Sequence, residues 1–519
     1  MVGGAARSRQ RCRQASAGAG APQPRSLEVA GYRPGDLQQW TSTGYDSWRD
    51  PDVDGRADWS PTVSDAQAQR QSPSVPGLFA SGAVVTSEIE ASVGQCQLWS
   101  AYQRDGAEVL DSSIRFRIRG ALDLDALAGA VEDLVTRHEI LRTTFEFRDG
   151  TLRQRLHEPA PLRYDLVNLT ELDLSEEARR DRSTTHKAAD IDPSSRPPVW
   201  LTVQRFGPTD HQIRLNLHAL LADDWSCEII ARDLKALYRR RTGERVELPA
   251  VAWQFSDWTS WAGQWSTGDG LRRMRDYWSK QLDGARLPAL PDRGAPTSPW
   301  PERVAVTRHL PGELAGRLRG LARRHRTTLF PLLLTAFAAE LHRASGQDDL
   351  TIFSLFANRG RPEVNETVGP FAHLVPLRCR VPDTRDAAQF VRDTHRTFVG
   401  AFAHQELYLH QYPDDVREEL GVSGDGFRRM MVFQLMNRLH GDNEVAGLEF
   451  EDDADVLDTP FPFELSVHAS EDELAVVLLC WPSEYEQSWA DRFVDRYVQV
   501  LTAIAGADAD LDTELFRSR

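Results

Sequence analysis

The chain has 519 residues, 41% of them hydrophobic, with 14 tryptophans and 21 phenylalanines, and its formal net charge is -16. This length allows two or three domains with a large core, and the apolar content predicts a folded protein rather than a disordered one. The acidic balance disfavours nucleic acid and anionic membrane surfaces as partners, because binding to either needs a basic surface.

The cysteines and the apolar runs of the sequence indicate the cellular compartment in which the protein works. The five cysteines are scattered and form no Cys-x-x-Cys pair, so neither a disulfide framework nor a metal site is expected. The sequence has no run of about 18 apolar residues, and its arginine-rich N-terminus lacks the apolar core of a secretory signal. We therefore expect a cytoplasmic protein that holds no metal.

Residues 1–85 differ in composition from the rest of the chain. They are rich in Ala, Gly, Ser, Gln, Pro and Asp, and their aromatic residues are isolated. This composition predicts a disordered N-terminal extension. A passive tail or an upstream start codon explains it more simply than the alternative, a segment that docks a partner.

Regular patterns begin near residue 86. Apolar residues alternate with arginines over residues 114–118, which is the period of a half-buried strand. Asp123 is placed to cap a helix that follows it. Asp149-Gly150 stands between two alternating runs, so a β-hairpin is expected there.

A second group of signals lies before the middle of the chain. Residues 212–217 predict a strand, and a helix is expected to begin near Asp223 or Asp224. That helix should end at three arginines, 239–241, because cations suit a helix C-terminus. Residues 284–302 hold five prolines and predict a linker.

The second half of the sequence also mixes helix and strand signals, with a helix expected over residues 328–343 and a strand over 350–356. The fold class is therefore α/β (α+β). The predicted organisation is a first lobe over 86–283, a proline-rich interlobe linker over 284–303 and a second lobe over 304–519. Two lobes of similar size suggest a structural duplication, although no clear sequence repeat is present.

The most informative run is residues 216–226, Asn-Leu-His-Ala-Leu-Leu-Ala-Asp-Asp-Trp-Ser. It resembles the signature of peptide-synthetase condensation domains, His-His-x-x-x-Asp-Gly, which is often followed by Trp-Ser. Ala219 stands where that family has its second histidine, usually assigned the catalytic role, and Asp224 stands where it has glycine. The positions that match the signature are His218, Asp223, Trp225 and Ser226.

Other short runs are similar to further condensation-domain motifs, and they occur in the family's order over about residues 88–510. The ordered set is more specific than any single motif. The runs are residues 92–99, 137–145, 254–258, 277–278, 357–363 with 368–371, 404–406, 433–437 and 463–465.

The resemblance implies two chloramphenicol-acetyltransferase-like lobes that form a V-shaped pseudo-dimer around a central tunnel, with the signature mid-tunnel. It implies a donor carrier protein at one mouth and an acceptor at the other. No cofactor is expected to be bound, since the substrates would arrive on phosphopantetheine of peptidyl or acyl carrier proteins. No adenylation or carrier region is recognised in the sequence, which favours a free-standing monomer that works in trans.

The resemblance also assigns roles to the signature residues. Asp223 matches the family's aspartate, which forms a structural ion pair with an arginine of the far lobe, and Arg359 or Arg361 is the candidate partner. For His218 we favour a buried, hydrogen-bonded histidine over a relocated base. Asp224 is expected to cap the helix that follows it; facing the tunnel, it would favour a cation.

His373 stands where the family usually has asparagine, and it is the candidate for a displaced imidazole. We favour a polar residue without a catalytic role at this position. His138 and His404 are expected to be structural by family analogy. The remaining tunnel candidates from the matched motifs are Asn358, Gln434, Ser92, Gln95 and Arg142.

Two functions compete. The first is condensation-type acyl transfer in nonribosomal peptide or hybrid biosynthesis, which joins a carrier-bound acyl thioester to an amine or hydroxyl. Ala219 has no proton-accepting atom, so positioning of the substrates would dominate. The second is an inactive protein, similar to the X domains of glycopeptide synthetases, that binds a carrier protein and recruits a tailoring oxygenase. X domains share the altered histidine and the Asp-Asp pair. We favour the enzyme, and place cyclisation or epimerisation behind both.

Overall fold

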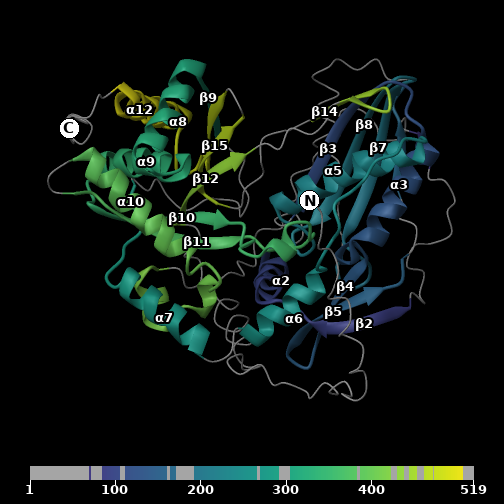
Figure 1. The fold of residues 1–519 in the computed structure, drawn as a ribbon, viewed down its shortest axis with the longest axis horizontal. Coiled ribbons are helices and arrows are strands. Elements are labelled where there is room, and N and C mark those ends of the chain that lie inside the picture. Colours follow the sequence, from purple (N-terminus) through teal and green to yellow (C-terminus); the bar gives the residue numbers. More distant parts are fainter. Residues whose placement is uncertain are drawn as a thin grey trace, which may run out of the picture.

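The computed structural model of the chain describes residues 69–71, 84–105, 111–159, 164–170, 192–265, 269–290, 304–382, 386–421, 429–437, 444–452, 461–470 and 473–506. These residues form two lobes that lie side by side, and each lobe has its own main sheet with helices (Figure 1). The predicted mixed α/β class is therefore confirmed. The V shape and the central tunnel stay predictions.

The first lobe is built on a seven-stranded sheet with the order β1-β6-β7-β8-β3-β14-β13. Two helices, α3 (Leu124–Arg137) and α5 (Asp224–Arg241), pack against each other beside it, and α5 contacts β3. The strands are β1 Gln69–Gln71, β3 Asp111–Arg119, β6 Tyr164–Asn168, β7 Val199–Gly207, β8 Asp210–His218, β13 Glu444–Val445 and β14 Leu448–Asp452.

The strand, the helix cap and the hairpin that local sequence patterns predicted for the first lobe are present. The expected strand at 114–118 lies within β3, and Asp123 caps α3 by accepting hydrogen bonds from the Asp125 and Ala126 amides. The expected hairpin joins β4 (Thr143–Arg148) to β5 (Thr151–His157) in a separate sheet with β2 (Val85–Glu90). Its turn residues have φ of 53° and 78°, the left-handed conformation that Asp-Gly tolerates.

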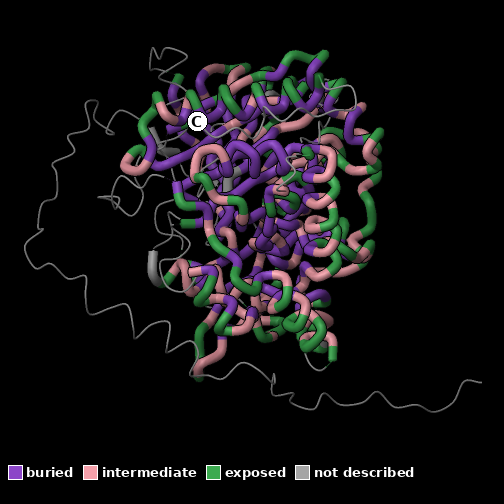
Figure 2. Tube along the Cα trace, turned by 90° about the vertical axis from the view of Figure 1, so that its left-hand side faces the viewer, coloured by how far each residue is buried: buried purple, intermediate pink, exposed green. Residues whose placement is uncertain are grey.

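The second lobe is built on a six-stranded sheet with the order β11-β10-β12-β15-β16-β9. Helix α9 (Leu329–Ser345) is buried along most of its length, as its nearly continuous apolar sequence requires. Figure 2 shows that buried residues run through the interior of the molecule and that exposed residues lie on its outer segments. The strands are β9 Val304–Leu310, β10 Asp349–Phe356, β11 His373–Arg380, β12 Met431–Asn437, β15 Phe463–Ala469 and β16 Leu474–Cys480.

The remaining helices complete both lobes. Helix α9 follows the expected segment 328–343, and β10 follows the expected strand 350–356. The helices are α2 Val93–Asp105, α6 Phe255–Trp265, α7 Asp269–Leu282, α8 Gly312–Arg324, α10 Ala387–Phe402, α11 Asp414–Glu419 and α12 Gln487–Gly506. In the part of the chain that the structure describes, no helix has the length and apolarity needed to cross a bilayer.

Segments from the second half of the sequence also take part in the first lobe. Strand β14, from the second half of the sequence, pairs antiparallel with β3 of the first lobe, with Phe450 opposite Ile118. Phe371 and Tyr408 belong to the hydrophobic core of the first lobe. These contacts join the two halves of the sequence, and the division of the chain at 283 and 304 stays a prediction.

Some residues of the expected extension and linker take part in regular structure or in a hydrophobic core. Residues 69–71 of the expected extension pair with β6 as an edge strand, and most of the segment 1–85 lies outside the described residues. Ala285 and Leu290 of the expected linker are buried in the core of the second lobe, because they carry apolar side chains next to α7. Residues 291–303 lie outside the described part of the chain.

Candidate active site

The candidate site is the turn between β8 and α5. Strand β8 ends at His218 and α5 begins at Asp224, so residues 219–223 connect the middle of the first sheet to a helix N-terminus. Strand β8 is hydrogen-bonded to β7 on one side and to β3 on the other. The turn is therefore anchored at both ends by regular structure.

His218 is held in one tautomer. Its Nδ1 accepts a hydrogen bond from the Leu220 amide at 3.0 Å, so the neutral ring carries its proton on Nε2. Nε2 is buried and has no hydrogen-bond partner among the described residues. Burial lowers the pKa of His218 to about 4, so the ring is neutral near pH 7.

This arrangement bears directly on the role expected for His218. The lone pair of Nδ1 is already engaged by Leu220, and Nε2 carries a hydrogen rather than a free lone pair. The ring packs edge-on against Tyr102, with centroids 5.3 Å apart. The geometry therefore fits a buried, hydrogen-bonded histidine and provides no free acceptor for a substrate proton.

Asp223 ties the first lobe to the second. Its Oδ1 accepts the Ser226 amide at 2.8 Å, which caps α5, and lies 3.3 Å from Nη2 of Arg359. Its Oδ2 accepts the amides of Phe371 and Ala372, both at 3.0 Å. Both charged side chains are almost fully buried. A buried carboxylate with this many donors is well compensated, so the pair can persist in the interior.

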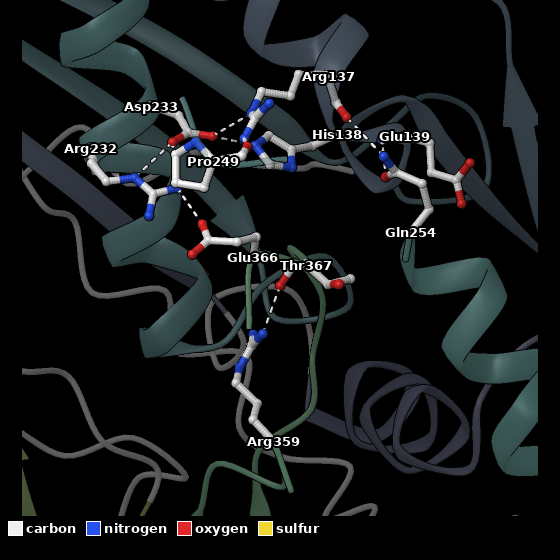
Figure 3. A network of polar contacts seen from close by, with 10 residues as sticks. All are labelled: Arg137, His138, Glu139, Arg232, Asp233, Pro249, Gln254, Arg359, Glu366 and Thr367. Atoms are coloured by element: carbon white, nitrogen blue, oxygen red, sulfur yellow. Dashed lines mark hydrogen bonds and ion pairs between the residues drawn. The ribbon is translucent and has the colours of Figure 1, made fainter. Parts of the chain in front are cut away.

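Arg359 reaches the same turn from the second half of the chain. Its Nη1 donates to the carbonyls of Val364 and Thr367 at 2.6 and 2.8 Å, and Figure 3 draws the second of these bonds. Its Nη2 also donates to Ser226 Oγ at 2.8 Å, and the guanidinium lies 4.2 Å from the ring centre of Phe371. Arg359 therefore holds its own loop and the signature turn together.

Arg361, the alternative partner predicted for Asp223, is placed elsewhere. Its Nη2 lies 3.1 Å from Glu363 Oε1. Its guanidinium stacks over the rings of Trp253 and Trp261, at 5.1 and 4.7 Å. This corrects the expectation for Arg361: the planar group is taken up by aromatic faces, a common environment for arginine.

Two more signature residues contact the second half of the chain. Ser226 is fully buried; its Oγ donates to the Gly369 carbonyl at 2.8 Å and accepts the Gly369 amide at 3.0 Å. The Trp225 indole donates to the Asn365 carbonyl at 3.3 Å. A side chain at Gly369 would overlap the ring of Phe255, so this close approach requires glycine.

Asp224 differs from its neighbours. It is the first residue of α5 and does not cap it, since Asp223 takes that position; the expectation that Asp224 caps the helix was wrong. Its side chain is exposed, and within the described residues it makes no hydrogen bond or ion pair. Desolvation and then the charge of Asp223 raise the pKa of Asp224 to about 6.

Ala219 is half-buried in the turn and offers only a methyl group. Behind it, the turn is held by α2. Gln95 Nε2 donates to the Leu220 carbonyl at 3.2 Å and to Gln154 Oε1 at 3.2 Å. Ser92 and Gln95 also cap the start of α2 reciprocally, each accepting the other's amide. Both residues are buried, so they support the turn from the protein side.

Three other predicted tunnel residues make their polar contacts with groups outside the signature turn. Arg142 donates to the His157 carbonyl at 2.6 Å, in the three-stranded sheet. Gln434 accepts from Ser354 at 3.4 Å within the second lobe. Asn358 is buried and has a left-handed backbone, with φ of 50°. No hydrogen bond or ion pair joins these residues to residues 218–224 among the described contacts.

His373 stacks on Tyr408, with ring centroids 4.3 Å apart, at the start of β11. It is buried, and neither ring nitrogen makes a hydrogen bond of good geometry among the described residues. Burial lowers the pKa of His373 to about 4. An imidazole enclosed in this way fits the expected non-catalytic role better than that of a displaced base.

A buried network that the motif analysis did not single out lies along α5 (Figure 3). Asp233 Oδ2 accepts hydrogen bonds from His138 at 2.9 Å and from Arg137 at 2.7 Å, and Arg232 bridges Asp233 to Glu366. Burial opposes ionisation of Asp233, but the bonds from His138, Arg137 and Arg232 outweigh it and lower its pKa to about 2. The sequence did hold a signal for this network, because Asp233 is a charged residue within the apolar face of α5.

Comparisons with known proteins agree on the family. The model of the Condensation domain matches residues 88–515. The chain is 29% identical over 427 residues to the nonribosomal peptide synthetase kk1B of Curvularia clavata, which covers 80% of this chain and 3% of that protein. The chain spans 3% to 8% of the length of the first curated relatives it matches.

Two solved structures share the fold. SgcC5 of Streptomyces globisporus superposes with a TM-score of 0.68 at 24% identity, over 81% of this chain and 100% of the other. The complex of the X-domain and OxyB from teicoplanin biosynthesis superposes with a TM-score of 0.69 at 23% identity, over 83% of this chain and 98% of the other. At these identities the likeness concerns the fold.

Proposed function

Because the chain belongs to the condensation-domain family, we propose that it transfers an acyl group from a carrier-protein thioester to an amine or hydroxyl in nonribosomal peptide or hybrid biosynthesis. The donor is presented on the phosphopantetheine arm of a peptidyl or acyl carrier protein, and a second carrier can present the acceptor. The protein binds no cofactor of its own and works in the cytoplasm as a monomer.

One observation carries this proposal: the signature turn keeps its scaffold although it has lost an imidazole. Asp223 is bound to Arg359 and to two amides of the second half of the chain, and Gln95 holds the Leu220 carbonyl from behind. These buried polar contacts are satisfied, so they hold the backbone of the turn in one arrangement. The scaffold therefore supports substrate positioning.

The reaction needs little more than positioning. A thioester is already activated, so the nucleophile attacks its carbonyl carbon, the C–S bond breaks, and the proton of the nucleophile ends on the released thiol. Orientation of two reactants can contribute roughly 7 kcal/mol or more to such a step. The base that Ala219 lacks would add typically about 10²–10⁴-fold. We therefore expect a slow enzyme rather than an inactive one.

The test is a transfer assay with purified protein, an acyl donor loaded on a carrier protein, and a panel of carrier-bound and free amines and alcohols. Mass spectrometry of the product reports amide or ester formation. A product that depends on the protein supports the proposal. Absence of product with every donor and acceptor, at a protein concentration that saturates carrier binding, contradicts it.

A second candidate function is a condensation-like protein that binds a carrier protein and recruits a tailoring oxygenase. It is supported by the shared fold with an X-domain found in complex with OxyB, and by the alanine at 219. This candidate predicts tight, stoichiometric binding of a monooxygenase without turnover. Size-exclusion chromatography of the protein with a loaded carrier and a candidate oxygenase separates the two functions, because acyl transfer requires no such complex.

A further inference from the structure

We propose that the face of the seven-stranded sheet opposite α3 and α5 binds residues 36–65 of the same chain, which we call the acidic segment. The acidic segment lies outside the residues that the structure describes, whereas the face is formed by β3, β7 and β8. The contact goes beyond the proposed acyl transfer, because it joins two parts of one chain and needs no substrate.

The two faces of this sheet differ in chemistry. Ile213, Leu215 and Leu217 of β8 belong to the hydrophobic core that α3 and α5 complete. Side chains alternate along a strand, so the residues between them point to the opposite face. The strand ladders place polar residues of β3 and β7 beside these on that face. We call it the arginine face, and its members are Arg115, Arg117, Gln204, Arg214 and Asn216.

Two arginines stand directly opposite each other on the arginine face. Arg115 of β3 and Arg214 of β8 are Cα partners in the ladder, and like charges in this position destabilise a pair of strands. Arg117 differs, because Asp210 accepts two of its hydrogen bonds, at 2.6 and 2.7 Å. Asp165 of β6 stands in the row of Arg214 but two strands away, which is about 10 Å. A carboxylate placed over Arg115 and Arg214 therefore stabilises the face.

The arginine face is buried, although α3 and α5 lie on the other side of the sheet. Arg214, Gln204 and Asn216 are 6%, 4% and 1% exposed. Within the described residues, neither polar atom of the Asn216 side chain makes a hydrogen bond, and Oε1 of Gln204 makes none either. Buried amides without partners are costly. The face therefore calls for a covering group that supplies hydrogen-bond donors and acceptors, as a polypeptide backbone does.

A small apolar cluster adjoins the arginine face. Val167, Leu169 and Phe206 form a buried cluster that is separate from the two main cores. The guanidinium of Arg117 lies 5.2 Å from the ring centre of Phe206, so the cluster and the arginines share one surface. Satellite clusters of this kind usually lie beneath a covering stretch of chain. The covering group should therefore carry apolar side chains as well as carboxylates.

The acidic segment carries both kinds of side chain. It holds seven aspartates and three tryptophans against two arginines. It ends at Asp65, four positions before Gln69 begins β1, and β1 pairs with β6 at the edge of the same sheet. Three strand spacings, about 14 Å, separate β1 from β8, and four or five extended residues span about that distance. The covalent link thus holds the segment at high effective concentration beside the face.

The bound segment lies on the same side of the sheet as the signature histidine. Positions 214, 216 and 218 of β8 alternate with the core positions, so Arg214, Asn216 and His218 share this face. The contact therefore places part of the chain's own N-terminal region on the approach to the signature turn.

The test is photo-crosslinking in the full-length protein, with p-benzoylphenylalanine in place of Trp59 of the acidic segment. Irradiation should link this position to β6 or β7 of the same chain, and peptide mass spectrometry identifies the linked residues. The same photoreactive group in place of Phe402, an exposed residue of α10 in the second lobe, is the matched control. It should give no link to β6 or β7.

Charge substitutions test the chemistry of the contact. Replacing all seven aspartates of the acidic segment with asparagine should lower the crosslinking yield about tenfold, as expected when charge-assisted hydrogen bonds are lost. Arg115→Gln should lower it in the same way, and Arg115→Lys, which keeps the charge, should retain most of it. Arg308→Gln removes an arginine that pairs with Asp491 and Asp495 in the second lobe, and it should leave the yield unchanged.

Several results would overturn the proposal. They are a link from position 59 only to elements other than β6 and β7, a link between two chains, which a denaturing gel shows as a doubled mass, and no link at all. A yield that neither the seven substitutions nor Arg115→Gln lowers would also overturn it. The substituted aspartates lie outside the described fold, so a folding defect in Arg115→Gln does not leave the proposal untested.

Discussion

Oδ1 of Asp223 and Nη2 of Arg359 lie 3.3 Å apart, although 136 residues separate them in the sequence. The pair is almost fully buried, and both partners use their remaining atoms to bind backbone groups of the segment from Val364 to Ala372. One charge pair thus sets the position of the signature turn relative to the second lobe.

Removing one member of this pair should destabilise the fold. Asp223→Ala leaves a buried guanidinium unpaired and two amides without an acceptor, so the free energy of unfolding should fall by about 3 kcal/mol or more. Urea denaturation measures it. Arg361→Ala is the control: its ion pair with Glu363 is half-exposed, and we expect a loss of about 1 kcal/mol. Equal losses of unfolding free energy in the two variants would contradict a stabilising buried ion pair between Asp223 and Arg359.

Gly369 should tolerate no side chain. A Cβ at this position would overlap the ring of Phe255 and press on the bonds between Gly369 and Ser226, so Gly369→Ala should cost about 1–3 kcal/mol. Thermal unfolding followed by circular dichroism measures it. In Gly360→Ala the added methyl meets no atom within 4 Å, and its melting temperature should stay close to that of the wild type. A wild-type melting temperature in Gly369→Ala would show that the two segments do not pack so closely.

The buried histidines should make the fold sensitive to mild acid. Burial lowers the pKa of His218 and of His373 to about 4, whereas an unfolded histidine titrates near 6.5. Between these values the unfolded state binds the extra protons, so stability is full above about pH 6.5 and is lost as the pH falls towards 4. Each histidine can contribute up to about 3 kcal/mol to this loss.

Urea denaturation at several pH values between 7.5 and 4.5 checks this slope. His373→Asn, which introduces the residue usual in the family, should flatten it. His309→Asn, at an exposed position of β9, should leave the slope as in the wild type. A slope that His373→Asn does not change would mean that this ring is not enclosed in solution.

Restoring the missing imidazole should raise activity. Ala219→His adds a proton acceptor to a turn whose scaffold is intact, so the transfer rate should rise by about 10²–10⁴-fold if the base is what the site lacks. Single-turnover kinetics with one donor and one amine measure this rate, and Ala219→Gln controls for side-chain size without a base. An equal rate in both variants would mean that the new side chain is not directed at the reacting groups.

The sequence predicted those parts of the fold that short-range patterns specify. The strand at 114–118, the Asp149-Gly150 hairpin and the helix that begins at Asp224 all depend on neighbouring residues, and all three are present. The pairing of β14 with β3 of the first lobe could not be predicted from neighbouring residues. That strand has only five residues, and its partner β3 lies more than 300 positions earlier.

In the candidate site, too, some contacts could be predicted from the sequence and others could not. Asp223 and Arg359 were proposed as partners from motif position, and the structure places them in contact. The sequence left Arg359 and Arg361 as alternative partners of Asp223. The structure distinguishes them, because the guanidinium of Arg361 packs over Trp253 and Trp261 instead. The tautomer of His218 depended on one backbone amide, Leu220. Such choices are made by long-range packing and by loop geometry, which a single sequence does not specify.

The most direct test of the account compares two rates for the same carrier-bound thioester and the same amine, one with the wild-type protein and one without it. If the signature turn works by positioning its substrates, the protein should accelerate amide formation well above the uncatalysed rate even with alanine at 219. A rate equal to the uncatalysed one, under conditions in which the loaded carrier is shown to be bound, would contradict the account and leave the recruiting function in its place.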